Sequence, residues 1–351
     1  VQTCALPISS NADNRQAKIS TILASGDKNI DLISVNDEMI SEFKHKGYLE
    51  PLEKNVMTEE VRDSFPQKYL ESICEENGHI YSVPFQMDIM MFWVNQELLK
   101  QAGLDEIKNT GDFDILQKSL KNPDQYAYGD AWENTHVYNS LSQFVNFWGG
   151  DYFDWTDPKT KDAARYMKSM LDEKNTSPAQ FVDQYEQMEE KFIRGKYGCV
   201  FMYTSALGTF LDADVYGKNK IHMAPLPVLH KKKATNIATW QYVLNNASEN
   251  KDAAVRFLQY AAGYEGSTEY AKIMKSYPAR VDVIENEDID LEGIDMIRKY
   301  LREYTLNARP LCENSMGAVS DMGKLFQGYV LGQCEEDSFF EQAQNCINTY
   351  Y

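Results

Sequence analysis

Hydrophobic residues in this chain fall into short continuous runs and into stripes with helical spacing. Residues 30–35 form a continuous apolar run with a single acid, which is typical of a buried strand in a parallel sheet. Asn36 and Asp37 follow this run, and a helix that ends by Gly47 comes next. A strand, a polar turn and a helix make a βα unit, and ligands tend to bind where such a strand ends. The other role for Asn36 or Asp37 is to cap the helix.

Two further apolar runs, residues 80–83 and 89–94, are rich in β-branched and aromatic residues and predict strands. Because Pro84 cannot donate to a ladder, we expect the first strand to end there and the chain to cross to another element. Gln86 and Asp88 lie in this crossing, where a carboxylate beside aromatic side chains is well placed to face a cleft.

The remaining pattern alternates helices with strands. Helical spacing predicts helices over residues 15–25, 58–69, 112–120 and 250–264, and two more that begin at Asn95 and Asp157. Strands are predicted over residues 197–203 and 237–244, and further crossings over residues 221–228 and 277–280.

Aromatic residues are dense between residues 126 and 152, and most of them are expected in the core. Trp132 is the exception, because it follows Gly129 and Asp130 in a predicted loop. An aromatic plate next to polar groups can stack on a ring-shaped ligand.

Length and charge restrict the function further. At 351 residues the chain is expected to form two domains. It carries 35 Lys and Arg against 53 Asp and Glu, a formal net charge of -18, which argues against nucleic acid or an anionic membrane surface as partner. No apolar run is long enough to span a bilayer.

Several familiar chemical signatures are absent. The sequence has no CxxC pair, no phosphate loop, no dinucleotide fingerprint, and neither G-x-S-x-G nor H-E-x-x-H, and its histidines have no ligand spacing. We therefore expect no metal and no cofactor. A glycosidase-like pair of carboxylates stays open, as does a bridge between Cys334 and Cys346. Residues 1–8 resemble a translated sequencing adapter, in which case Cys4 has no meaning.

Short motifs stand in order along the chain: LASGD (residues 23–27), IDLISV (30–35), GYLEPL (47–52), GHIYSVP (78–84), NQELLKQAGL (95–104), WGGD (148–151), FIRGK (192–196), APLP (224–227), AAVRFL (253–258), YPAR (277–280) and RP (309–310). Their order and spacing resemble the extracellular solute-binding proteins of ABC importers, in the sugar-binding cluster that includes maltose- and trehalose-binding proteins. The resemblance covers essentially residue 9 to the end.

The resemblance implies an α/β fold of two lobes, the type II periplasmic-binding-protein fold, with hinge crossovers and closure on the ligand. It places residues 9–89 and 228–277 in the first lobe and residues 90–227 and 278–351 in the second. It also implies that the family's first strand, first helix and second strand are missing from this sequence.

The same resemblance places ligand-binding residues in the cleft between the lobes. Gln86 and Asp88 would lie in this cleft, where an acid typically accepts hydrogen bonds from sugar hydroxyls, and Trp240 would stack on a pyranose ring. The alternative for Trp240 is core packing, and for Asp88 and Arg309 it is an ion pair between lobes. The complete set of expected ligand-binding residues is Asn36, Asp37, Gln86, Asp88, Trp132, Tyr203, Thr204, Trp240 and Arg309.

The function implied is non-catalytic capture of a mono- or oligosaccharide and its delivery to the membrane permease subunits of an ABC importer. The protein is expected to be a monomer outside the cytoplasmic membrane, lipid-anchored or periplasmic, with its signal segment outside this sequence. A polyamine or another cationic small molecule is the alternative ligand, because acidic and aromatic side chains also suit cations. A carbohydrate-cleaving enzyme is the remote alternative.

Overall fold

The computed structural model describes residues 12–351, which form two compact units. The first unit holds the described residues up to Met87 together with Thr239–Ile289, and the second holds Asp88–Ala238 with Asp290–Tyr351. The chain therefore passes between the units three times. Residues 1–8, in which the sequence suggested an adapter, lie outside the described residues.

The unit boundaries differ from the predicted ones at all three crossings. At the first, residues 88 and 89 belong to the second unit and not to the first. Residues 228–238 belong to the second unit, where the backbone N–H of Val228 donates to the carbonyl of Lys108 at 2.7 Å. Residues 278–289 belong to the first unit, where Arg280 donates to the carbonyl of Ala262 at 2.8 Å. The two prolines at 225 and 227 therefore lie within one unit rather than at a crossing.

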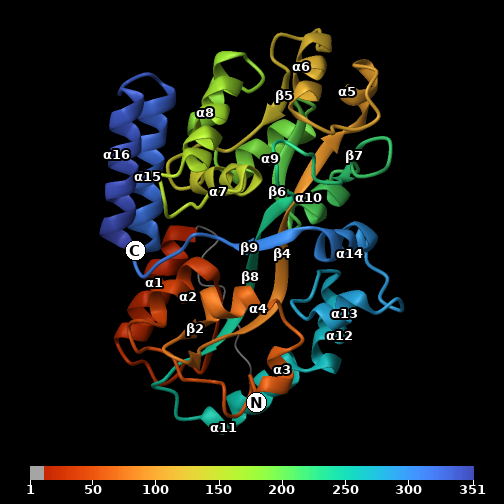
Figure 1. The fold of residues 1–351 in the computed structure, drawn as a ribbon. Coiled ribbons are helices and arrows are strands. Elements are labelled where there is room, and N and C mark those ends of the chain that lie inside the picture. The colour runs from red at the N-terminus through yellow and green to blue at the C-terminus, as the bar shows by residue number, and fades with distance from the viewer. Residues whose placement is uncertain (1–11) are drawn as a thin grey trace. The chain divides into compact units, whose positions relative to one another are not determined.

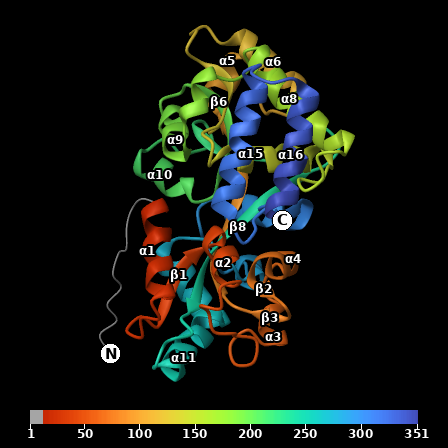
Figure 2. The same cartoon turned by 90° about the vertical axis from the view of Figure 1, so that its left-hand side faces the viewer.

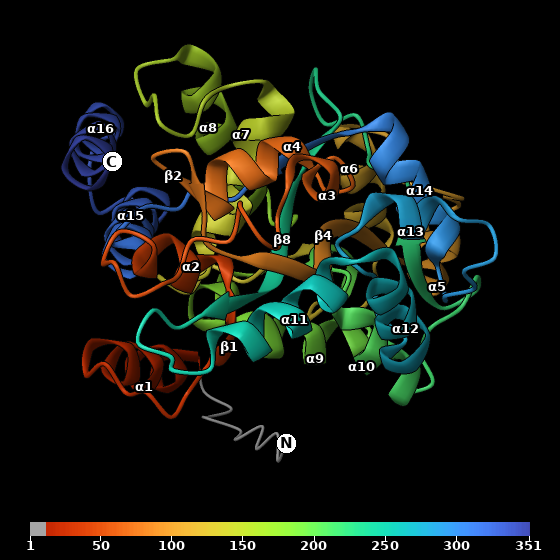
Figure 3. The ribbon, with the colours of Figure 1, turned by 90° about the horizontal axis from the view of Figure 1, so that it is seen from below.

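The first unit is built from short helices around a small sheet (Figure 1). Its elements are α1 (Ala12–Ala24), β1 (Leu32–Asn36), α2 (Asp37–Phe43), α3 (Glu59–Arg62), α4 (Gln67–Tyr69), the π-helical turn η1 (Leu70–Cys74), β2 (Glu75–Glu76), β3 (His79–Ile80), the start of β4 (Val83–Asn95), the end of β8 (Ala234–Leu244), α11 (Lys251–Ala262), α12 (Tyr264–Met274) and α13 (Val281–Glu285). Helices α11 and α12 lie side by side in it (Figure 3).

In this unit β1 pairs antiparallel with the end of β8, from Leu32 opposite Leu244 to Asn36 opposite Trp240. One face of the ladder is buried and contains a polar network. Tyr69 accepts a hydrogen bond from Gln241 at 3.0 Å and from Thr239 at 2.7 Å. Among the alternate positions, Trp240 and Tyr242 on β8 are only partly buried and Ser34 on β1 is exposed, so these residues form the outer face of the ladder.

The second unit holds the longer helices. Its elements are the end of β4, α5 (Gln96–Gln101), α6 (Thr110–Ser119), β5 (Tyr126–Gly129), α7 (Val137–Trp148), α8 (Pro158–Asp172), the 3₁₀ turn η2 (Pro178–Val182), α9 (Tyr185–Ile193), β6 (Tyr197–Tyr203), α10 (Ala206–Asp212), β7 (Ile221–Ala224), the start of β8, α14 (Ile294–Glu303), β9 (Thr305–Ala308), α15 (Ser315–Val330) and α16 (Glu336–Tyr350). Helices α15 and α16 lie against each other along their lengths (Figure 2).

In the second unit the end of β4 lies between β6 and β7 and is antiparallel to both. Strand β5 is parallel to β6, and β9 is parallel to the start of β8. All seven residues of β6 are buried, which is the pattern of a central strand. The core is aromatic, since Tyr128, Phe144 and Phe201 have ring centroids within 6.2 Å of one another.

Several predicted element boundaries are confirmed. The Asn95 side chain caps α5 by accepting from the backbone N–H groups of Glu97 and Leu98, and Asp157 caps α8 ahead of Pro158. The helix predicted over residues 58–69 is interrupted at Pro66 into α3 and α4.

The prediction that a strand ends at Pro84 is wrong, because β4 runs from Val83 through Pro84 to Asn95. Pro84 is only the second residue of the strand, where a missing N–H disturbs the ladder least. The next residues are paired with the segment after Tyr277, since the N–H of Met87 donates to the Tyr277 carbonyl at 3.0 Å. Gln86 and Asp88 are therefore strand residues and not parts of a loop.

The five cysteines within residues 12–351 are all free thiols, so the bridge left open between Cys334 and Cys346 is not formed. In the described part of the chain, no cluster of three or more His, Cys, Asp or Glu side chains has the arrangement of a metal site. None of the helices there has both the length and the apolar character that crossing a membrane requires.

Candidate ligand-binding site

Asp88 and Thr204 meet in the second unit, where β4 passes the end of β6. The Thr204 hydroxyl donates to Oδ1 of Asp88 at 2.7 Å, and the backbone N–H of Ser205 donates to the same oxygen at 2.8 Å. None of the hydrogen bonds formed by the described residues ends on Oδ2. Asp88 is 7% exposed, and this burial raises the pKa of its carboxyl, although the bonds from Thr204 and Ser205 act in the opposite direction. The buried carboxylate thus keeps one oxygen for another donor.

Arg309, which follows β9, lies between two tyrosine rings. Its guanidinium carbon is 5.9 Å from the ring centroid of Tyr138 and 5.8 Å from that of Tyr203, and one of its N–H groups donates to the Tyr138 hydroxyl at 2.6 Å. The Tyr203 hydroxyl in turn donates to Oδ1 of Asn139 at 2.9 Å. Burial lowers the pKa of Arg309 to about 9. A buried cation with aromatic rings on two sides is a ready partner for hydroxyl or carboxylate oxygens.

Tyr203 and Thr204 are consecutive residues, so the end of β6 carries both groups of contacts. One residue contacts the Arg309 cation and the next donates to the Asp88 carboxylate. The structure therefore brings four of the predicted residues together in two pairs. The sequence separates Asp88 from Thr204 by 116 positions and Tyr203 from Arg309 by 106.

Trp132 is a correction. It is fully buried, its indole N–H donates to Oδ2 of Asp130 at 2.8 Å, and its ring packs edge-on against Phe181 and Phe326. Asp130 also accepts hydrogen bonds from Tyr128 and Ser140, so it connects three buried side chains of the core. No ring face of Trp132 is open to a ligand, so Trp132 is a core residue.

The other predicted residues belong to the first unit. Asn36 caps α2, because its Oδ1 accepts from the backbone N–H of Met39 at 3.1 Å, and its ladder partner is Trp240, which is half-buried. Asp37 is fully buried in the first turn of α2. Gln86 is half-buried and its Oε1 accepts from the Tyr270 hydroxyl at 2.7 Å.

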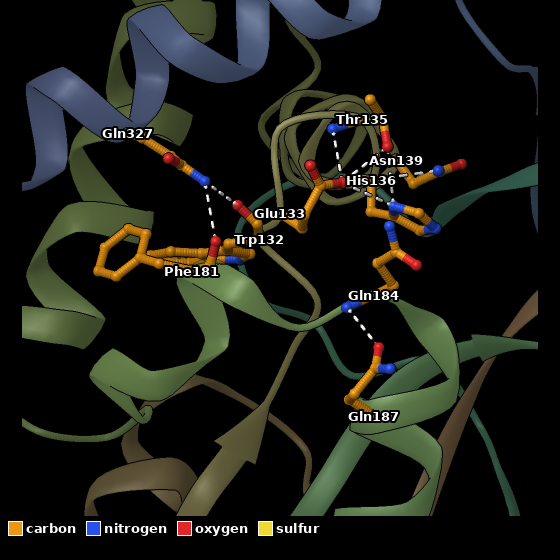
Figure 4. A network of polar contacts seen from close by, with 9 residues as sticks. All are labelled: Trp132, Glu133, Thr135, His136, Asn139, Phe181, Gln184, Gln187 and Gln327. Atoms are coloured by element: carbon orange, nitrogen blue, oxygen red, sulfur yellow. Dashed lines mark hydrogen bonds and ion pairs between the residues drawn. The ribbon is translucent and has the colours of Figure 1, made fainter. Parts of the chain in front are cut away.

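Sequence reasoning missed a group of polar residues in the second unit, which Figure 4 shows from close by. These are Glu133, Thr135, His136 and Asn139, which lie in the loop after β5 and the first turn of α7, and Gln184 at the start of α9. Tyr185, which follows Gln184 and is not drawn in the figure, packs against the His136 ring. The one available signal was four consecutive polar residues, at positions 133–136, within an aromatic segment. Spacing alone does not show that α9 comes to the same place.

The sequence model of the family described as bacterial extracellular solute-binding protein matches residues 7–268 of the 351. This chain belongs to that family. The predicted family membership is therefore confirmed.

Two curated relatives show how far the similarity extends. A probable amino-acid ABC transporter periplasmic-binding protein, y4oP, of Sinorhizobium fredii is 24% identical over 239 residues, which are 65% of this chain and 54% of the relative. An arabinooligosaccharide-binding protein of Bacillus subtilis is 22% identical over 286 residues, 77% of this chain and 65% of the relative. The matches thus span between about half and two thirds of the length of these solute-binding proteins.

Solved structures of solute-binding proteins share the fold. An ABC transporter solute-binding protein from Thermotoga lettingae bound with α-D-tagatose has a TM-score of 0.82 at 19% identity, over 96% of this chain and 89% of that one. Maltose-bound MalE3 of T. maritima has a TM-score of 0.80 at 16% identity, over 98% and 90%. The chain therefore has the two-lobe α/β fold of periplasmic binding proteins.

Proposed function

We propose that this chain is the non-catalytic solute receptor of an ABC importer and that its solute is a carbohydrate or a polyol. The observation that carries the proposal is the pair of contacts at the end of β6. There, Tyr203 flanks the Arg309 cation while Thr204 donates to the half-occupied Asp88 carboxylate. Sugars combine apolar ring faces with hydroxyl edges, and they need this combination of aromatic rings and charged hydrogen-bonding groups.

Each unit supplies some of the residues that we propose to bind ligand. Asp88, Tyr203, Thr204 and Arg309 come from the second unit, and Asn36, Asp37, Gln86 and Trp240 from the first. Capture by closure of the two lobes, as the family resemblance implies, belongs to the same proposal.

The relatives support a carbohydrate as the ligand, but they do not identify which carbohydrate. The B. subtilis relative is named for arabinooligosaccharides, and solved neighbours contain α-D-tagatose, maltose, D-mannitol or ribitol. The S. fredii relative is named for amino acids, which makes an amino acid the second candidate. A polyamine stays the cationic alternative, given the net charge of -18.

Thermal unfolding and titration calorimetry with three panels test the proposal. The first panel holds maltose, α-D-tagatose, D-mannitol, ribitol and arabinotriose, the second holds the common amino acids, and the third holds putrescine and spermidine. A probe at about 100 times its dissociation constant adds about 2.7 kcal/mol to the free energy of unfolding. A response confined to the first panel is the expected result. Responses confined to the second or third panel would replace the carbohydrate with that class.

Two further parts of the proposal need separate measurements. Recovery of the bound sugar unchanged after long incubation is expected of a receptor, whereas cleavage would identify an enzyme. Delivery to permease subunits, a monomeric state and a lipid-anchored or periplasmic position are proposed from the family. Co-purification of the full-length protein with permease subunits in the membrane fraction tests the delivery step.

A further inference from the structure

A carboxylate and an imidazole lie side by side just before α7, outside the residues that the sequence predicts to bind ligand (Figure 4). Nδ1 of His136 is 3.1 Å from Oε2 of Glu133. We propose that His136 presents Nε2 to the ligand as the acceptor for a hydroxyl group, and that Glu133 is the residue that positions it. The inference rests on the proposed function and names the group that this part of the second unit recognises.

Glu133 fixes which ring nitrogen of His136 carries the proton. Its Oε2 accepts the backbone N–H of Thr135 at 2.9 Å and the Thr135 hydroxyl at 2.6 Å. Burial alone would raise the pKa of Glu133, but the hydrogen bonds from Thr135 and His136 outweigh it, and the pKa is lowered. Because a charged carboxylate only accepts, Nδ1 of neutral His136 is the protonated nitrogen and Nε2 keeps its lone pair.

Nε2 is available to a ligand. All hydrogen bonds of the His136 ring within residues 12–351 are made by Nδ1, and the side chain is 24% exposed. A ring that is held by one nitrogen and partly exposed presents its other nitrogen as an oriented acceptor.

His136 is continuous with the predicted site. Its ring lies edge-on to Tyr185, with centroids 5.6 Å apart, and Tyr185 is 5.9 Å from Tyr203, which flanks Arg309. The helix turn that follows His136 carries Tyr138 and Asn139, the partners of Arg309 and Tyr203. A ligand held at Tyr203 therefore needs to extend only past Tyr185 to meet His136.

The loop that carries the pair is fixed from two sides. Nε2 of Gln327 on α15 donates to the carbonyl of Trp132 at 2.6 Å and to that of Phe181 at 3.0 Å (Figure 4). The N–H of Glu133 donates to the carbonyl of Asp183 at 3.1 Å. A preorganised acceptor loses little conformational entropy when it binds, which suits a specificity-determining contact.

An oriented neutral acceptor selects a hydroxyl donor, which sugars and polyols share. A site built around such a bond discriminates against the analogue that lacks the hydroxyl, because the acceptor is then covered by the ligand and left unpaired. His136 therefore recognises one hydroxyl group of the ligand. Titrations with maltose and arabinotriose, compared with titrations with D-mannitol and ribitol, show whether that hydroxyl belongs to a sugar or to a polyol.

The decisive test is calorimetric titration of two His136 variants with those panel sugars and polyols that bind the wild-type chain. His136→Asn keeps a donor toward Glu133 and removes the acceptor at the Nε2 position, and it should raise Kd by about 10-fold to 100-fold. His136→Gln restores an acceptor there and should stay within about 3-fold of wild type. Loss of discrimination against the corresponding deoxy analogue should accompany the weaker binding of His136→Asn.

Glu133 is tested as a positioning residue. Glu133→Gln keeps an acceptor for Nδ1 and should bind within about 3-fold of wild type, whereas Glu133→Met should weaken binding about 10-fold. The ¹⁵N spectrum of the ligand-free protein should show an unprotonated Nε2 in wild type and a protonated Nε2 in Glu133→Met. A purely structural role would not move this tautomer signal.

The outcomes distinguish a failure of the His136 role from a failure of the proposed function. If a probe binds wild type and His136→Asn equally well, the role of His136 is overturned while the proposed function stands. If no sugar or polyol binds wild type, the proposed function fails and this inference falls with it. A wild-type spectrum with the proton on Nε2 would also overturn the role of Glu133.

Discussion

Thr204 donates its hydroxyl to Asp88 across 116 residues of sequence, at a distance of 2.7 Å. The bond ties the end of β6 to the first residue of β4 that belongs to the second unit. It uses only Oδ1 of Asp88, so the contact orients the carboxylate without occupying it fully. The two predicted site residues thus form one hydrogen-bonded group, which makes their separate roles testable.

Asp88→Asn should weaken sugar binding by about 30-fold while leaving the protein at least as stable as wild type at pH 7. Asparagine can still accept from Thr204 and Ser205 through Oδ1, but its Nδ2 group replaces the acceptor offered to the ligand. Burial raises the pKa of Asp88 above its unfolded value, so its ionised form reduces the stability of the wild type. Titration calorimetry and urea unfolding measure the two effects.

The pH dependence of stability gives the control for this prediction. Since the folded pKa of Asp88 exceeds the unfolded value, the wild type loses stability relative to the variant as pH rises through the window between them. The stability difference between the proteins should therefore shrink on acidification. A stability difference in favour of Asp88→Asn that grows as the pH falls would contradict the burial argument.

Two tryptophans should separate binding from folding. Trp240→Ala, at a half-buried position on the outer face of the first unit, should raise Kd by about 10-fold or more with a small effect on unfolding. Trp132→Ala should instead lower the free energy of unfolding by about 3–5 kcal/mol, because it empties a fully buried site and leaves Asp130 without one donor. Calorimetric titration and denaturant unfolding of both variants check this, and equal behaviour of the two would reject the assignment.

Strand and helix positions were accessible to sequence reasoning where local signals are strong. Asn95 and Asp157 indicate where helices begin, because their side chains accept hydrogen bonds from free backbone N–H groups. The continuous apolar residues of β6 indicate a central strand. The strand end predicted at Pro84 was wrong because the effect of a proline depends on its position within the strand, which the sequence does not show.

The candidate site was only partly accessible, for a different reason. The resemblance suggested Asp88, Thr204, Tyr203 and Arg309. In the structure Thr204 contacts Asp88, and Tyr203 contacts Arg309. Trp132 was predicted to lie in the site because its neighbours in the sequence are polar. In the structure its indole N–H donates to Asp130, and the ring lies inside the core. His136 was passed over because its partner Tyr185 is 49 positions away on another helix.

Arg309→Met should weaken binding of the panel sugar by about 30-fold and should change stability little, because burial already disfavours the charged guanidinium. Arg309→Lys should not restore affinity, since an ammonium lacks the planar group that fits between the Tyr138 and Tyr203 rings. Isothermal titration of both variants decides this. Wild-type affinity in Arg309→Lys would show that charge alone matters and that the flanking rings do not.

Gly323 on α15 allows the helix to approach the loop that carries Glu133 and His136. A Cβ at this position would lie 2.0 Å from the carbonyl oxygen of Asn134, so Gly323→Ala must push helix and loop apart. We expect Gly323→Ala to destabilise the protein by about 1–3 kcal/mol and to weaken sugar binding, because the His136 ring loses its fixed position. Urea unfolding and calorimetric titration measure both effects.

Gly328 provides the matched control, because it lies on the same helix and a Cβ there would meet nothing within 4 Å. Gly328→Ala should keep wild-type affinity and gain slightly in stability, since alanine favours a helix interior by about 1 kcal/mol over glycine. Gln327→Leu, which removes the hydrogen bonds from Nε2 to the carbonyls of Trp132 and Phe181, should reproduce the binding defect of Gly323→Ala. If Gly323→Ala and Gln327→Leu bind sugar as tightly as Gly328→Ala, the close packing of α15 serves the core alone and does not position the ligand-binding loop.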